Sequence, residues 1–179
     1  MDDYLLRAFI SHLDRDQALA IGDAPASIQK WLEEIGLPLV LLRFMRWGWP
    51  QKDCDIALCS ILSSESIYAH DATLIFLKFR FLNIGNAING DWLVIDFSTD
   101  ACAPGFIPFA LWNPYTPEPK DPRELFQTIT RSLDSFLYRA MEGRYIPLDS
   151  YAAQDFNEFL AEEKASGQFG PYDGDKPPN

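Results

Sequence analysis

The spacing of apolar residues predicts helices at both ends of the chain. Apolar positions recur every three to four residues over residues 3–19, 25–35 and 38–47, and again over 121–143 and 148–164. This spacing puts them on one face of an α-helix and leaves the opposite face to charged residues. We therefore expect a helical beginning and a helical end, with a different kind of structure between them.

Residues that start or stop helices mark several of these boundaries. Asp23 or Ala24 is expected to cap the second helix, and Gly36 is expected to end it. Asp121 is the expected cap of the long helix 121–143, because Pro122 follows at the first helical position, where proline is well tolerated.

Between residues 50 and 112 the pattern changes to short apolar runs. The runs at 91–98 and 106–112 are expected to be strands. Another strand, at 79–85, is expected to follow a helix over 65–77. The run 55–64 fits either a strand or a short apolar element.

Helices followed by strands and again by helices predict an α+β fold. We expect a single domain over residues 1–165, in which a mainly antiparallel sheet of about four to six strands is packed by helices. The N-terminal and C-terminal helices would flank this sheet. Residues 166–179 are rich in Gly and Pro and are expected to form a tail, with Phe169 and Tyr172 as its anchors.

The composition changes this picture mainly through charge. The 179 residues include 26 acidic and 15 basic side chains, which gives a net charge of −11. Such a chain repels nucleic acids and anionic membranes and attracts basic partners, although acidity can also serve solubility alone. The N-terminus starts with acids, unlike a secretory signal, and no apolar run is long enough to span a bilayer. We therefore expect a cytoplasmic protein with reduced cysteines.

The stretch LNIGNAINGDWLVIDF, residues 82–97, is the first candidate for chemistry. Gly85 and Gly90 are spaced like part of a phosphate-binding loop, but the Lys-Ser/Thr pair of such a loop is absent, and a strand follows instead of a helix. Asn89 and Gly90 tolerate the positive φ of hairpin turns. A turn between two strands is the preferred interpretation, and in it Asp91 is not required to bind a ligand or another segment of the chain.

Metal ligands are present but poorly spaced. Four oxygen donors lie in or near the turn, namely Asn86, Asn89, Asp91 and Asp96. They lack the spacing and the terminal Glu of a calcium hand. The candidate zinc ligands are His70 and the cysteines Cys54, Cys59 and Cys102. They include no closely spaced pair, so no metal site is predicted.

Catalytic groups are not indicated either. His12 and His70 accompany no serine or cysteine in a nucleophile elbow. His70 lies at an expected element boundary, where a local cap or turn role is the simpler explanation. The residues by themselves therefore define no reaction, and they predict no catalytic residue and no cofactor.

The same segment resembles the signature of the SUKH superfamily, which includes bacterial toxin-immunity proteins. Phe81–Gly85 is similar to the family's strand that ends in Ile-Gly, and Asn89–Asp96 to its Gly-Asp turn and following strand. Gly36–Pro38 precedes an apolar helix, as in family members, and Ser132–Leu137 is similar to their closing pattern. By this resemblance, a third strand would end at Trp112.

The resemblance covers about residues 30–140 and implies a non-catalytic α+β protein that binds and neutralises a toxin, such as a nuclease. The expected partner is a cognate protein toxin with a basic surface. Binding of nucleic acid, of a membrane or of a cofactor is not expected, and the sequence leaves open whether the protein forms a homodimer. The family's Asn-Gly is replaced by Trp47–Pro50, so the subgroup and the toxin are undefined. The alternatives are a scaffold or regulatory module of the same fold, and a small hydrolase or nucleotide-binding enzyme.

Strand alternation indicates where a partner would bind. If Leu93, Ile95 and Phe97 face the helices, their neighbours along the strand point to the opposite face. Together with residues of adjacent strands, these neighbours form the predicted partner-binding set: Asn83, Trp92, Val94, Asp96 and Trp112. An exposed Trp beside acids is typical of an interface hot spot. The alternative is that the C-terminal helix covers this set, which then extends the core.

Overall fold

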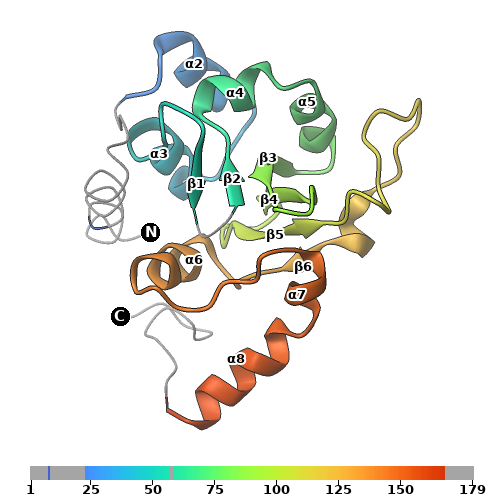
Figure 1. The fold of residues 1–179 in the computed structure, drawn as a ribbon. Coiled ribbons are helices and arrows are strands. Elements are labelled where there is room, and N and C mark those ends of the chain that lie inside the picture. Colours follow the sequence, from blue (N-terminus) through green and yellow to red (C-terminus); the bar gives the residue numbers. More distant parts are fainter. Residues whose placement is uncertain (1–7, 9–22, 57–58, 168–179) are drawn as a thin grey trace.

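A six-stranded antiparallel sheet lies at the centre of the fold, and each strand pairs with its neighbour in the sequence (Figure 1). The computed structural model describes residue 8 and residues 23–56 and 59–167. The expected helix 3–19, apart from residue 8, and the tail anchors Phe169 and Tyr172 lie outside these residues. The strands are β1 (Cys54–Ile56), β2 (Cys59–Ile61), β3 (Phe81–Asn86), β4 (Trp92–Asp96), β5 (Ala103–Ile107) and β6 (Gln127–Thr128).

Helices cover both faces of this sheet, which confirms the α+β prediction. They are α2 (Ala26–Glu34), α3 (Leu39–Trp47), α4 (Ser64–Ala69), α5 (Asp71–Lys78), η1 (a 3₁₀ helix, Pro122–Leu125), α6 (Leu133–Met141), α7 (Ser150–Gln154) and α8 (Phe156–Ala165). In the view of Figure 1, α2 to α5 are drawn above the strands and α6 to α8 below them.

The two faces of the sheet bury separate groups of side chains. The main core joins the inner residues of β3, β4 and β5 to α2, α3 and α6 and to Phe156 of α8. The second, smaller core lies on the opposite face, where Ala72 and Phe76 of α5 pack on Trp92 and Val94. Both faces are therefore covered, and alternation along β4 separates the two cores.

The start of α2 differs from the expected one. Pro25 occupies the capping position and makes no side-chain hydrogen bond there, so the predicted cap at Asp23 or Ala24 is wrong. Ala24 is instead buried, and its N–H donates to the carbonyl of Arg46 at 3.1 Å. The end of the helix is as predicted, since Gly36 adopts a φ of 68°.

The long helix expected over residues 121–143 is three elements. Asp121 does cap a helix, accepting from the Arg123 N–H at 2.9 Å, but this is the short η1. The chain then forms β6, whose Thr128 pairs with Gly105 of β5. Only after Ser132, the cap of α6, does a regular helix begin. Pairing with β5 gives the backbone N–H and C=O groups of β6 their hydrogen-bond partners, although the sequence pattern predicts a helix there.

Three other expected elements have different bounds in the structure. The strand expected over 106–112 begins at Ala103 and ends at Ile107, because Pro108 has no N–H to continue the ladder. Trp112 therefore lies in a turn after β5 and does not end a strand. The helices expected over 65–77 and 148–164 are each divided in two, at His70 and at Asp155. His70 caps α5 through its Nδ1, which accepts from the Ala72 N–H at 3.2 Å, as predicted.

Candidate functional site

Three of the predicted partner-binding residues, Trp92, Val94 and Trp112, belong to the second core, and most of the set is buried. Asn83 and Val94 are fully buried, and Trp92 and Trp112 are each 5 % exposed. The expected exposure of Trp92 is therefore wrong. Among the described residues, none from the C-terminal helix α8 belongs to the second core. Trp92 and Trp112 are instead covered by α5, whose Phe76 ring lies 5.5 Å from the ring of Trp92 and 4.8 Å from that of Trp112.

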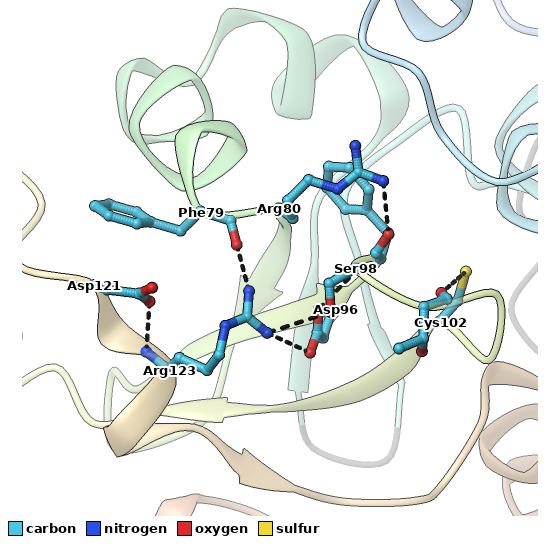
Figure 2. Close-up of polar contacts among 9 residues, drawn as sticks. Phe79, Arg80, Asp96, Ser98, Cys102, Asp121 and Arg123 are labelled. Atoms are coloured by element: carbon cyan, nitrogen blue, oxygen red, sulfur yellow. Dashed lines mark hydrogen bonds and ion pairs between the residues drawn. The ribbon is translucent and has the colours of Figure 1, made fainter.

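Asp96 is the one member of the set that is partly exposed, and an arginine already occupies its carboxylate (Figure 2). Arg123 of η1 donates from Nη1 to Asp96 Oδ2 at 2.8 Å and from Nη2 to the carbonyl of Phe79 at 2.7 Å. Its guanidinium also lies 4.8 Å from the ring of Phe81. Arg123 therefore connects η1 to the end of β4 and to the residue that follows α5. A partner that binds the Asp96 carboxylate would have to compete with Arg123.

The turn between β3 and β4 is the hairpin that the sequence predicts. The Gly90 N–H donates to the Ala87 carbonyl at 2.9 Å, and Gly90 has a φ of 89°. Gly85 is required for another reason, since a Cβ at this position would collide with the backbone carbonyl of Ser60 on β2. Both glycines thus serve the sheet and its turn.

Asp91 ends this turn and holds two distant segments to it. Its Oδ1 accepts from the Phe109 N–H, and its Oδ2 from the Ser150 N–H, each at 3.0 Å. Oδ2 also accepts from Asn89 Nδ2 at 2.8 Å. The sequence interpretation gave Asp91 nothing to hold, and this was wrong. Phe109 and Ser150 lie 18 and 59 residues further along the chain, so no local pattern connects them to Asp91.

The environment of Asp91 favours its charged form. The residue is 4 % exposed, and burial by itself would raise its pKa. The hydrogen bonds from Ser150, Asn89 and Phe109 outweigh burial and hold the pKa of Asp91 below its ordinary value. A buried carboxylate with this many donors fixes the positions of the three segments that carry them.

The three segments that meet at Asp91 carry exposed apolar side chains. We call these residues the Asp91 patch: Ile88, Phe109, Leu111 and Tyr151. Each has more than half of its surface exposed, and Ile88 reaches 71 %. The Phe109 ring lies 5.9 Å from the ring of Trp92, so the second core supports the patch from beneath. Large apolar side chains gathered on a surface are typical of interaction sites.

The segments of the Asp91 patch are also free of basic residues. Residues 86–95, 101–119 and 145–163 contain no Lys or Arg, but they include the acids Asp149 and Asp155. The segments that carry the patch are therefore acidic or neutral along their own sequence. A partner with basic groups around an apolar centre would be complementary to it.

The candidate zinc ligands show no sign of reactive chemistry. Burial, followed by nearby carboxylates, raises the pKa of Cys54, Cys59 and Cys102 to about 11 in each case. Thiols with such pKa values stay protonated at neutral pH and react slowly. Over residues 23–56 and 59–167, no group of three or more His, Cys, Asp or Glu side chains is arranged to hold a metal ion.

In the same described ranges, the helices are too short or too polar to cross a membrane. Comparisons with protein-family models, with curated proteins and with solved structures returned no match to this chain. The case for a function therefore rests on the residues and on their geometry.

Proposed function

We propose that this protein is a cytoplasmic, non-catalytic binding protein that neutralises a cognate protein toxin with a basic surface, as its resemblance to SUKH immunity proteins implies. The observation that carries the proposal is the Asp91 patch. It combines exposed aromatic and aliphatic side chains on segments that contain acids and no Lys or Arg. Interfaces of high affinity use such apolar anchors at their centre and charge complementarity around them.

The way in which the patch is held supports this role. Asp91 fixes the β3–β4 turn, the chain after β5 and the start of α7 with hydrogen bonds of 2.8 to 3.0 Å. Loops that are ordered before binding lose less conformational entropy when a partner arrives. The net charge of −11 would in addition accelerate encounter with a basic toxin through long-range attraction.

The predicted partner-binding set has a different place in this proposal. Trp92 and its buried neighbours support the patch through Phe109 and are not themselves the contact surface. Asp96 could contact a partner only if Arg123 released it. The contact residues that we propose are thus those of the Asp91 patch. Its Phe109 packs on the outer side of Trp92, which belongs to the set that strand alternation selects.

The test is co-expression with any protein that is encoded beside this one, has a basic surface and arrests growth when it is expressed alone. We expect the wild type to rescue growth and to co-purify with the toxin. The double variant Phe109→Ser/Tyr151→Ser should weaken binding by about 30-fold or more, since truncated hot-spot residues cost about 2 kcal/mol or more. Leu39→Ser is the matched control, because Leu39 on α3 is 69 % exposed, as Tyr151 is, and lies outside the patch.

Equal affinity of the double variant and the control would refute the role of the patch. Failure of the wild type to bind or rescue would refute neutralisation of that toxin. Capture of the toxin without rescue of growth would favour the alternative, a scaffold or regulatory module of the same fold.

A further inference from the structure

A pocket of about 270 Å³ lies between the loop that follows α6 and the helices α7 and α8. Its walls are Tyr145, Ala152, Asp155, Phe156 and Phe159. Pockets for drug-sized ligands measure about 300–1,000 Å³. This one is therefore closer to the space that a single large side chain requires.

Three aromatic rings form most of the pocket. The ring of Tyr145 meets that of Phe159 edge to face at 5.0 Å, and Phe159 is stacked with Phe156 at 5.7 Å. Tyr145 remains 46 % exposed, so the aromatic wall is open to solvent. The faces of such rings carry negative potential and attract cations.

One guanidinium already packs against these rings from the inside. The side chain of Arg139 on α6 is fully buried, and its guanidinium lies 5.1 Å from the ring of Phe156 and 5.9 Å from that of Phe159. Glu163 accepts from both Nη atoms of Arg139, at 2.9 and 3.3 Å, and thereby neutralises its charge. A second cation on the outer side would therefore face a neutral ion pair and not a bare positive charge.

The rim of the pocket adds a carboxylate. Asp155 lies between α7 and α8 and is exposed. Its carboxylate makes no hydrogen bond or ion pair within residues 23–56 and 59–167. Tyr151 of the Asp91 patch precedes Asp155 by four residues, a spacing that puts both on one side of α7. Ala152 of the pocket wall directly follows Tyr151, so α7 contributes to both the pocket and the patch.

We propose that this pocket receives an arginine side chain of the basic partner, with its guanidinium against Tyr145 and Phe159 and its charge paired with Asp155. Arginine suits the site because its planar group stacks on aromatic faces and bonds carboxylates at the same time. This inference rests on the proposed function, since it names a side chain of the same partner. It concerns a different part of the surface from the Asp91 patch.

The direct test uses the full chain and N-acetyl-arginine amide as the probe, followed by NMR chemical shifts of the aromatic rings. N-acetyl-citrulline amide is the neutral control of nearly the same shape. We expect the arginine probe to shift the signals of Tyr145 and Phe159 and to bind at least about fivefold more tightly than the citrulline probe. Asp155→Asn should remove most of that preference, whereas Glu34→Gln, which removes an equal charge on α2, should not.

Equal binding of the two probes, or an unchanged preference in Asp155→Asn, would overturn the arginine assignment. Binding that appears only after deletion of residues 168–179 would also overturn it, because the pocket would then belong to this chain's own tail. The two proposals can fail separately. If Phe109→Ser/Tyr151→Ser abolishes toxin binding while Asp155→Asn leaves it unchanged, the pocket is not used and the proposed function stands.

Discussion

Replacement of Asp91 by alanine is expected to destabilise the protein strongly, although the side chain is small and lies in a turn. The change leaves the N–H groups of Phe109 and Ser150 without their acceptor, and Asn89 loses its bond as well. A buried N–H without a partner costs about 1–3 kcal/mol. Two such groups, together with the lost bond to Asn89, give an expected loss of about 3–5 kcal/mol in the free energy of unfolding.

The same bonds predict how this contribution depends on pH. The folded pKa of Asp91 lies below the ordinary value of 3.8. A lowered folded pKa means that the contribution is fully present above the unfolded pKa and is lost as the pH falls through the folded pKa. The difference in unfolding free energy between the wild type and Asp91→Asn should therefore be constant from pH 7 to about pH 5 and should shrink below about pH 4.

Urea denaturation followed by tryptophan fluorescence measures both effects. With an m-value of about 2 kcal/mol/M, a loss of 4 kcal/mol lowers the midpoint by about 2 M. Asp100→Asn is the control, since Asp100 is exposed and its replacement should change the midpoint little. A loss below about 1 kcal/mol for Asp91→Ala, or a loss that matches the control, would refute the idea that Asp91 holds the three segments together.

Three further predictions concern the core, a buried ion pair and the thiols. Gly85→Ala should destabilise the protein by more than Gly90→Ala, because only the first creates a clash with the backbone of β2; thermal unfolding of both variants gives the comparison. Arg139→Ala should lower the free energy of unfolding by about 3–5 kcal/mol, since it leaves Glu163 without its buried partner. The double variant Arg139→Ala/Glu163→Gln should regain part of that loss, as a double-mutant cycle measured by chemical denaturation would show. The three cysteines, with pKa values of about 11, should react slowly with iodoacetamide at pH 8 in the folded protein and quickly in urea. Rapid labelling of the buried Cys59 and Cys102 in the folded protein, measured by mass spectrometry, would contradict this prediction.

Several features of the fold could be predicted because their signals are local. Gly36 lies just after the end of α2, and α3 begins after Pro38, as the positions of these residues indicate. The β3–β4 turn follows from Asn89 and Gly90, whose backbones accept the conformation that a hairpin needs. In each case the residues that decide the structure lie within one turn of the place that they determine.

Other features could not be predicted, because they depend on contacts between distant residues. The helix pattern over 121–143 is interrupted by β6, which exists only because β5 offers an edge to pair with. Alternation places Trp92 on the face of the sheet opposite the main core, and the structure confirms that position. The exposure that was expected from this position is wrong, because Trp92 is buried. Alternation does not reveal that α5 covers the second face as well, and the contact surface that we propose therefore includes Phe109 in place of Trp92.

The sequence by itself determined the α+β class, the acidic character and the alternation that divides β4 between two cores, because periodicity and charge are properties of neighbouring residues. Only the tertiary structure decided what each face of the sheet meets. It showed that Asp91, which the sequence places in a turn, also accepts hydrogen bonds from Phe109 and Ser150, which are 18 and 59 residues away. It also placed Tyr145 beside Phe159, because the loop after α6 folds back on α8. Such contacts depend on how the chain closes on itself, and no spacing of residues along the chain records them.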